Sequence, residues 1–302
     1  MYSVENFFDL SILRISEENP DAIARIIHSQ SAKSDIVAIS PVTQDLIGSI
    51  GRDYFLVPEK IGYTKDLSKV ESIDDLYRRK DRSLRHLAES VVEVRVSDPL
   101  SPAQYADFLT LYASAMSEKE RGVMKLDSSW QRKHPHAVGI FVYYEGKMIA
   151  GLLAKKINQR LSVSYSALSR DFRRNNVYKF LAIRAMGYAK EKGMEEFSYG
   201  RDTNLYGHHL ATGLYLFKRE LNLRPTILPK TNFLLRRFIN LEKFQNPVFF
   251  FSVDDISHPM LSGNIVLRDG ADPEIARGYK IADMRLNVFT WNGATTNKID
   301  EL

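Results

Sequence analysis

Cysteine is absent from this chain of 302 residues, which excludes disulfide bonds, thiolate metal sites and cysteine nucleophiles. Long hydrophobic runs are absent as well. The longest apolar stretches, residues 138–144 and 148–154, fall far short of the roughly 18–20 residues that a membrane-spanning helix needs. Residues 1–5 contain neither a basic segment nor the start of an apolar block, so the sequence predicts no signal peptide. From these absences we expect a cytoplasmic protein without a membrane span.

A strong excess of one charge is also missing. The chain has 42 Lys and Arg against 37 Asp and Glu, a net charge of +5, with 44% hydrophobic and 26% charged residues. These proportions are typical of a globular protein and exclude disorder throughout the chain. The small positive excess suits an anionic ligand, such as a phosphorylated cofactor or a nucleic acid, but many enzymes without such a ligand carry as much.

Between residues 91 and 228 the hydrophobic pattern alternates between strands and helices. The expected elements are a strand at 91–96, a helix that Ser101 caps, strands at 138–144, 148–157 and 161–168, a helix at 177–192, a strand at 196–199, a helix at 209–221 and a strand at 224–228. A meander followed by strand–helix alternation predicts an α/β fold of the α+β type, with one mixed sheet and helices on both of its faces.

The segments on either side of this region are less regular. Before it, we expect a helix at 20–29, strands at 35–40 and 54–57, and a helix that begins at the capping residue Ser72 and continues to Val91. After Pro229, the apolar residues between Phe233 and Leu241 predict one more helix, and strand-like pieces follow at 248–253, 265–267 and 286–291. The length allows about two domains, at about 100–200 residues each.

The order of these elements resembles that of GNAT-type acyltransferases. Within it, Gly200-Arg201-Asp202 ends a strand, Phe217-Lys218 follows on the next helix and Pro225 comes shortly after, as in the FemAB-like branch of that superfamily. A basic segment at residues 79–85 is similar to the helix that enters the second acyltransferase-like half of FemAB-like proteins. The resemblance covers residues 72–228.

Proteins of this family move an acyl or aminoacyl group from coenzyme A or transfer RNA to an amine. The resemblance therefore implies a GNAT-like acyltransferase domain at residues 72–245. Residues 1–71 would then be a shortened, degenerate N-terminal half, and residues 246–302 a C-terminal extension whose role the sequence does not indicate.

One feature departs from the coenzyme-A-dependent members of the family. Their central helix follows a glycine-rich loop, whose backbone N–H groups hold the pyrophosphate. The corresponding residues 173–179 contain no glycine. We expect Arg173, Arg174 and Lys179, together with N–H groups of the helix, to hold the phosphate of the donor instead. No tightly bound cofactor is expected, and acyl-CoA would be a co-substrate.

The resemblance implies the main catalytic role for Lys218. Amide formation by attack on a thioester or ester passes through a tetrahedral oxyanion, which a positioned cation stabilises. Phe217 would pack beside the acyl group. The alternative is an exposed helix lysine next to Arg219.

Three further candidates for the active site lie on strands. Two of them lie where a strand ends, and the third lies within a strand. Arg201, beside Gly200, would bind a carboxylate or phosphate of the acceptor, and Asp202 would take a proton from the attacking amine. The alternative there is a turn with a structural ion pair. Strand alternation puts Tyr165 on the same face as Val163, so its phenol would orient the amine or protonate a leaving group, unless it is an ordinary core tyrosine.

The remaining residues predicted to contact the substrate are Tyr206, His208, His209 and Tyr215. Adjacent histidines on a helix diverge by about 100°, so His208 and His209 do not form a metal site, and no metal is expected. A basic cluster at residues 78–85 has two interpretations, a solvated helix face or a phosphate track for transfer RNA.

These observations predict an N-acyltransferase in which an amine acceptor attacks an activated acyl donor directly. Acyl-CoA or an acyl carrier protein is the expected donor, and an aminoacyl-tRNA is the alternative. A further alternative, from a different functional class, is a non-catalytic nucleic-acid-binding or scaffold protein on the same fold.

Overall fold

The computed structural model of the chain describes residues 1–50, 53–77, 92–117, 125–173, 176–208, 210–293 and 295–302. Residues 78–91 lie outside this range, and with them most of the helix predicted after Ser72 and the whole basic cluster. The start of that helix is described: Ser72 and Asp75 form the capping box of a short 3₁₀ helix, η2 (Ile73–Leu76). No helix in these described ranges is long and apolar enough to cross a membrane.

The chain folds into two compact units, each of which is built from more than one segment of the sequence. Unit 1 comprises Met1–Gly62, Arg201–Leu216 and Pro225–Leu302, and unit 2 comprises Tyr63–Gly200 and Phe217–Arg224. The sequence predicts three consecutive domains, at residues 1–71, 72–245 and 246–302. Each compact unit of the structure instead combines segments that are far apart in the sequence. The interpretation of residues 1–71 as a degenerate half stays a prediction.

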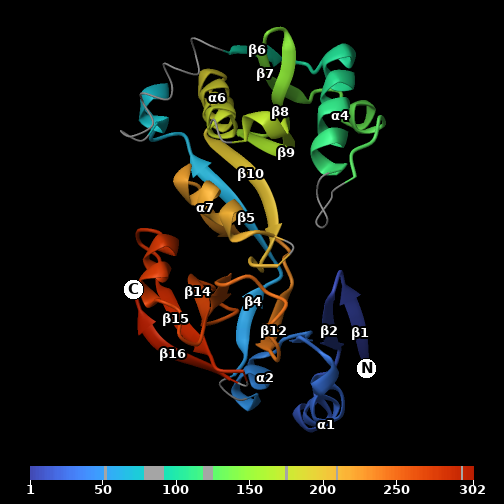
Figure 1. Cartoon of the computed structure of the whole chain (residues 1–302), viewed down its shortest axis with the longest axis vertical. Coiled ribbons are helices and arrows are strands. Elements are labelled where there is room, and N and C mark those ends of the chain that lie inside the picture. The colour runs from blue at the N-terminus through green and yellow to red at the C-terminus, as the bar shows by residue number, and fades with distance from the viewer. Residues whose placement is uncertain (51–52, 78–91, 118–124, 174–175, 209, 294) are drawn as a thin grey trace. The chain divides into compact units, whose positions relative to one another are not determined.

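Most of a seven-stranded mixed sheet belongs to unit 2 (Figure 1). Its strands, in spatial order, are β11 (Arg224–Ile227), β5 (Lys60–Asp66), β10 (Glu196–Thr203), β9 (Arg160–Leu168), β8 (Lys147–Ile157), β7 (Val138–Tyr144) and β6 (Glu93–Ser97). Strands β6 to β9 are antiparallel neighbours, and β10 runs parallel to β9. The predicted mixed sheet is therefore confirmed, with β5 as a strand that the sequence did not indicate.

Helices cover both faces of this sheet, as predicted. On one face, α4 (Pro102–Ser117) places Phe108 against Phe141, with ring centroids 6.1 Å apart, in a cluster that also contains Leu153. On the other face, Ser166 of β9, which pairs with Leu152, is hydrogen-bonded to the first turn of α6 (Val177–Glu191). Figure 1 shows the two helices on opposite sides of β7, β8 and β9. Three further helices connect strands of this sheet: α5 (Trp130–Lys133), η4 (Arg170–Phe172) and α7 (Thr212–Glu220).

Unit 1 contains two further sheets. The first has the order β1 (Tyr2–Phe7), β2 (Leu10–Ile15), β3 (Ile36–Ile39), β12 (Phe233–Phe238) and β4 (Phe55–Pro58), with α1 (Pro20–Gln30), η1 (Ser31–Lys33) and α2 (Gln44–Ser49) in its connections. The second has the order β13 (Val248–Val253), β14 (Leu261–Arg268), β15 (Leu286–Trp291) and β16 (Thr296–Glu301), with the 3₁₀ helix η5 (Pro273–Tyr279).

The helix predicted after Pro229 is wrong, because this segment forms the strand β12 in the interior of a sheet. β12 pairs with β3 on one side and β4 on the other. Its apolar side chains serve both faces, since Leu234 belongs to one core cluster and Leu235 to another. A strand buried on both faces shows a continuous apolar run, which periodicity alone does not distinguish from a helix.

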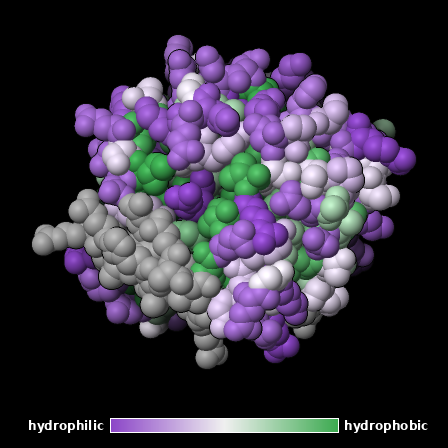
Figure 2. All heavy atoms as spheres, turned by 90° about the horizontal axis from the view of Figure 1, so that it is seen from above, coloured by the Kyte–Doolittle hydropathy of each residue, from purple (hydrophilic) through white to green (hydrophobic). Residues whose placement is uncertain are grey.

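The surface shows the usual segregation of side chains. The face seen in Figure 2 is mostly hydrophilic, with hydrophobic side chains gathered near its centre. Inside unit 2, the core around α4 is rich in aromatic rings, such as the stacked pair Tyr105 and Trp130.

Candidate functional site

Lys218 is a buried cation among aromatic rings. Its side chain lies on the part of α7 that belongs to unit 2 and is 2% exposed. The Nζ atom lies 4.3 Å from the ring centroid of Tyr63 and 5.9 Å from that of Tyr199. Both distances suit cation–π attraction, which stabilises the charged form of the lysine. This burial excludes the alternative of an exposed helix lysine.

Phe217, the neighbour of Lys218, joins the same group of rings. Its ring centroid lies 5.0 Å from that of Tyr178 on α6 and 5.7 Å from that of Tyr199 on β10. We call Lys218, Phe217, Tyr63, Tyr178 and Tyr199 the lysine cluster. All five residues belong to unit 2, and they come from β5, α6, β10 and α7.

The backbone next to the lysine cluster favours a glycine. Gly200 follows Tyr199 in β10 with a φ of +74°, in the left-handed region. A Cβ atom there would lie 3.3 Å from the carbonyl oxygen of Val163 in β9. The glycine of the predicted Gly200-Arg201 pair therefore permits both this conformation and the close approach of two strands.

The lysine cluster is suited to electrostatic stabilisation of a developing anion. In a buried site the effective dielectric constant is lower than in water, so a single positive charge acts more strongly on a nearby oxyanion. The rings of Tyr63 and Tyr199 attract the ammonium group at these distances. The arrangement has the chemical features of an oxyanion-binding cation.

Asp202, Tyr206 and Tyr215 are brought together, but in the core of unit 1. Tyr206 donates its hydroxyl to Asp202 Oδ2 at 2.7 Å, and its ring lies 5.9 Å from that of Tyr215. Tyr215 donates its hydroxyl to the carbonyl oxygen of Tyr279 at 2.5 Å and stacks on Phe249 with centroids 4.1 Å apart. Tyr206 and Tyr215 are almost fully buried. This position favours a structural role for both tyrosines.

The other predicted acceptor contacts are dispersed. Arg201 is exposed on β10. His208 is buried, with Nε2 2.6 Å from Asp9 Oδ1 and its ring packed on Phe244. His209 lies outside the described residues. No group of three or more His, Asp or Glu residues that could hold a metal ion occurs in the described part of the chain.

The predicted face of Tyr165 is wrong, because β9 contains a β-bulge. Tyr165 pairs with Leu153 and Val163 pairs with the next residue, Ala154, so one residue of β9 is skipped. Directly paired residues share a face and consecutive residues alternate, so the bulge puts Tyr165 and Val163 on opposite faces.

Tyr165 instead packs into the core under α4. Its ring contacts Tyr112 and Trp130 edge-on, with centroids 5.6 and 5.7 Å apart, and its hydroxyl donates to the carbonyl oxygen of Lys125 at 3.4 Å. Burial, followed by the negative charge of Asp127, raises the pKa of Tyr165. The phenol is therefore protonated at neutral pH.

The three residues predicted to hold the donor phosphate do not form one open site. Arg173 is exposed beyond η4, and Arg174 lies outside the described residues. Lys179 is buried in the first turn of α6, where its Nζ lies 3.5 Å from Glu220 Oε2. Its ammonium is therefore paired with a partly exposed carboxylate within unit 2.

Sequence reasoning missed three members of the lysine cluster. Tyr199 stands directly before the Gly200-Arg201 pair, and Tyr178 lies in the first turn of the central helix, so their positions offered a signal. Tyr63 gave none, because it lies in β5, a strand that the hydrophobic pattern did not indicate.

Comparison with known proteins agrees with this architecture over part of the chain. Residues 75–209 match the family model of the acetyltransferase (GNAT) domain. Among curated proteins no match is found. FemX is one similar solved structure, 14% identical over 79% of this chain and 84% of its own, with a TM-score of 0.44.

Two other solved structures illustrate the range of similarity. The C-terminal domain of a putative lysylphosphatidylglycerol synthetase from Agrobacterium fabrum is 13% identical over 78% of this chain and 80% of its own, with a TM-score of 0.43. An aminoglycoside acetyltransferase from an uncultured soil metagenomic sample is 16% identical over 36% of this chain and 76% of its own, with a TM-score of 0.31. Likenesses of this size carry no argument about function.

The family match is the finding that identifies the domain. It covers the chain from the 3₁₀ helix η2 to just beyond β10, and it ends before α7. It confirms the GNAT resemblance and the transferase class that the sequence predicts. Residues 75–209, less than half of the chain, therefore match the acetyltransferase (GNAT) domain family, and this match supports a transferase.

Proposed function

We propose that the protein is an N-acyltransferase that moves an acyl group from a thioester donor, acyl-CoA or an acyl carrier protein, to an amine acceptor. The buried ammonium of Lys218, 4.3 Å from the ring of Tyr63, is the observation that carries this proposal. A buried ammonium acts more strongly on a nearby oxyanion than an exposed one, and acyl transfer needs a cation where the oxyanion develops.

The proposed reaction forms one bond and breaks one. The nitrogen of the neutral amine attacks the carbonyl carbon of the thioester, and the carbonyl oxygen becomes an oxyanion that Lys218 Nζ stabilises. The intermediate then collapses, the carbon–sulfur bond breaks, and the thiol leaves with the proton that the nitrogen gives up. No acyl-enzyme forms, and the chain has no cysteine to form an acyl-thioester.

Asp202 is the proposed carrier of the proton, which it takes from the nitrogen and returns to the departing sulfur. Its carboxylate is buried and accepts the hydroxyl of Tyr206. Arg201, which is exposed, is the proposed contact for an acidic group on the acceptor. Phe217 is the proposed packing surface for the acyl group.

A second donor, an aminoacyl-tRNA, is favoured by one observation. Residues 173–179 contain no glycine, and the Nζ of Lys179 lies 3.5 Å from Glu220 Oε2. A site of this kind is less suited to the pyrophosphate of coenzyme A than a glycine-rich loop is. The thioester is preferred narrowly, because the matched family is described as acetyltransferases.

A donor comparison tests the proposal. The protein would be incubated with a pool of amines and either acyl-CoA thioesters or aminoacyl-tRNAs, and amide products would be detected by mass spectrometry. We expect amide formation with a thioester and release of free thiol. The thiol assay has no background from the protein, since the chain lacks cysteine. Amide formation only with aminoacyl-tRNA would select the second donor, and none with either would reject acyl transfer.

A further inference from the structure

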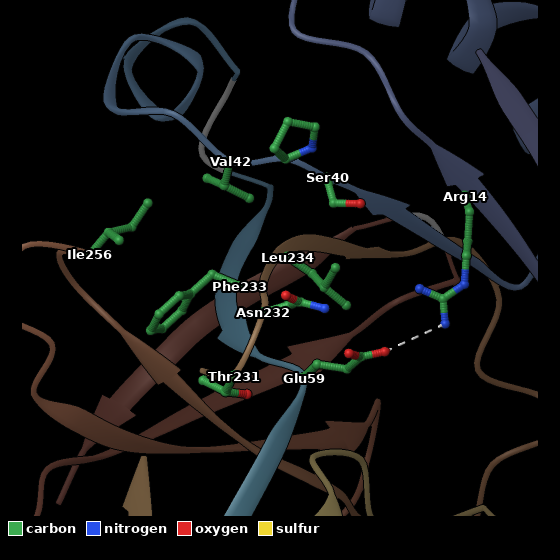
Figure 3. A pocket seen from close by; sticks show the side chains of 10 residues that line it. Arg14, Ser40, Val42, Glu59, Thr231, Asn232, Phe233, Leu234 and Ile256 are labelled. Atoms are coloured by element: carbon green, nitrogen blue, oxygen red, sulfur yellow. Dashed lines mark ion pairs between the residues drawn. The ribbon is translucent and has the colours of Figure 1, made fainter. Parts of the chain in front are cut away.

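Unit 1 contains a cavity of about 440 Å³ at one edge of its five-stranded sheet (Figure 3). The side chains that line it include Arg14, Val42, Glu59, Phe233 and Ile256. All of them belong to unit 1, and none is among the residues proposed for acyl transfer. The volume lies within the usual range of small-molecule sites, about 300–1,000 Å³.

The topology of the sheet explains why a cavity forms at this edge. β2 and β3 are parallel, and β12 is antiparallel to both β3 and β4, so β2, β3 and β4 all point the same way. Ser40 follows the end of β3 and Glu59 follows the end of β4, while Asn232 precedes β12. The cavity therefore lies at the carboxyl ends of three strands, the edge at which sheets of this kind bind ligands.

One wall of the cavity carries two opposite charges that do not bond directly. Arg14 Nη2 lies 3.9 Å from Glu59 Oε1, beyond hydrogen-bonding distance, and Figure 3 marks this ion pair with a dashed line. The two side chains are 34% and 30% exposed, so solvent reaches both. A partly exposed ion pair of this length contributes little to stability, and separating it to admit a ligand costs little.

The charges around this wall balance one another. Arg14 is held from the other side by Glu5, with Nε 2.6 Å from Oε2. Arg236 is buried nearby and donates to the carbonyl oxygen of Asn204 at 2.6 Å. Burial, followed by the positive charge of Arg14, lowers the pKa of Arg236 to about 10, so it remains charged at neutral pH.

This balance decides which ligand chemistry fits. An anion alone would approach Arg14 against the carboxylates of Glu5 and Glu59, and a cation alone would approach Glu59 against two guanidinium groups. A molecule with one group of each sign meets both charges favourably. The opposite wall is apolar: Figure 3 shows Val42, Phe233 and Ile256 grouped away from Arg14 and Glu59.

We propose that this cavity binds a small zwitterion of the α-amino-acid class that carries an apolar side chain. The carboxylate of the ligand pairs with the guanidinium of Arg14, and its ammonium pairs with the carboxylate of Glu59. An α-amino acid carries these two charges on adjacent carbon atoms, which suits two protein charges that lie close together. The side chain of the ligand packs against Val42, Phe233 and Ile256.

A ligand series on the unmodified protein tests the chemistry directly. Isothermal titration calorimetry would compare L-leucine with 3-methylbutylamine, which lacks the carboxylate, and with 4-methylpentanoate, which lacks the ammonium. Glycine tests the apolar wall and inorganic phosphate tests a simple anion site. We expect leucine to bind at least about ten-fold more tightly than each of the others, because each lacks at least one of the three contacts. Equal binding of the amine, the acid or phosphate would overturn the proposal, as would no binding of leucine.

Paired variants locate the site. Glu59→Gln keeps the shape of the side chain and removes its charge, so it should weaken leucine about ten-fold or more. The same variant should bind 4-methylpentanoate no more weakly than the unmodified protein does, because the acid then meets one carboxylate fewer beside Arg14. Arg14→Gln should weaken leucine to a similar extent. Glu301→Gln is the matched control, because Glu301 forms an exposed ion pair with Arg285, 3.0 Å apart, within the same unit. Unchanged leucine affinity in folded Glu59→Gln would place the ligand elsewhere.

The binding experiment is independent of the proposed acyl transfer. It is run without an acyl donor, and Lys218→Met should bind leucine as the unmodified protein does. Loss of leucine binding in Lys218→Met would mean that the amino acid is bound at the lysine cluster, which would overturn the assignment of this cavity.

Discussion

Lys218→Met removes the charge of the lysine cluster and keeps most of the aliphatic stem. If the ammonium stabilises the oxyanion, its loss costs about 2.7–4 kcal/mol of transition-state stabilisation, which corresponds to about 10²–10³ in kcat. The same substitution removes the contact with the Tyr63 ring, which contributes about 2 kcal/mol when desolvated, so each variant also needs a measured melting temperature.

The assay is steady-state thiol release at a series of amine concentrations, with a thermal melt of each variant. Lys190→Met is the matched control, because Lys190 lies in unit 2 and donates to the carbonyl oxygen of Leu67 at 3.1 Å, away from the lysine cluster. We expect kcat to fall in Lys218→Met alone, with KM nearly unchanged. A rise in KM alone would show that Lys218 only holds substrate. Normal turnover with a lower melting temperature would show that it is structural.

Three further predictions concern single contacts. Gly200→Ala should reduce the free energy of unfolding by more than Gly146→Ala, measured by urea denaturation, because both glycines have a φ near +75° but only Gly200 has a backbone oxygen 3.3 Å from the added Cβ. The pKa of His134 is held below 6.5 by burial and by neighbouring lysines, so the unfolded chain binds a proton at higher pH than the folded one. The melting temperature should then fall as the pH drops below 6.5, and less so in His134→Gln. Tyr215→Phe should cost about 1–3 kcal/mol of unfolding free energy, because it leaves the buried carbonyl of Tyr279 without this donor, and should leave KM unchanged; a raised KM with full stability would make Tyr215 a substrate contact.

Local patterns predicted the strands that are amphipathic or bounded by clear turns. β7 and β13 begin and end where the sequence predicts, and β8 and β9 differ by one residue at one end. The prediction failed at β12, whose apolar run fits a helix equally well. β5 was missed, because its polar residues Lys60, Thr64 and Lys65 interrupt the apolar pattern.

The candidate site was predictable in part. The Phe217-Lys218 pair was found through a motif, and the structure adds that Lys218 is buried among tyrosines. Those tyrosines come from distant parts of the chain, so only the fold shows that they are neighbours. Tyr165 failed for another reason, since a β-bulge of one residue reverses the face of every later residue in the strand, and no feature of the local sequence marks it.

A single-turnover experiment tests the central claim of direct acyl transfer most directly. Excess protein would be mixed with acyl-CoA and an amine acceptor, and quenched samples would be analysed for amide, free thiol and the intact mass of the protein. Direct attack predicts one thiol per amide, appearing together, with no acylated protein at any time. Thiol release ahead of the amide, together with a protein mass raised by one acyl group, would contradict direct attack, and release of neither product would contradict the thioester donor.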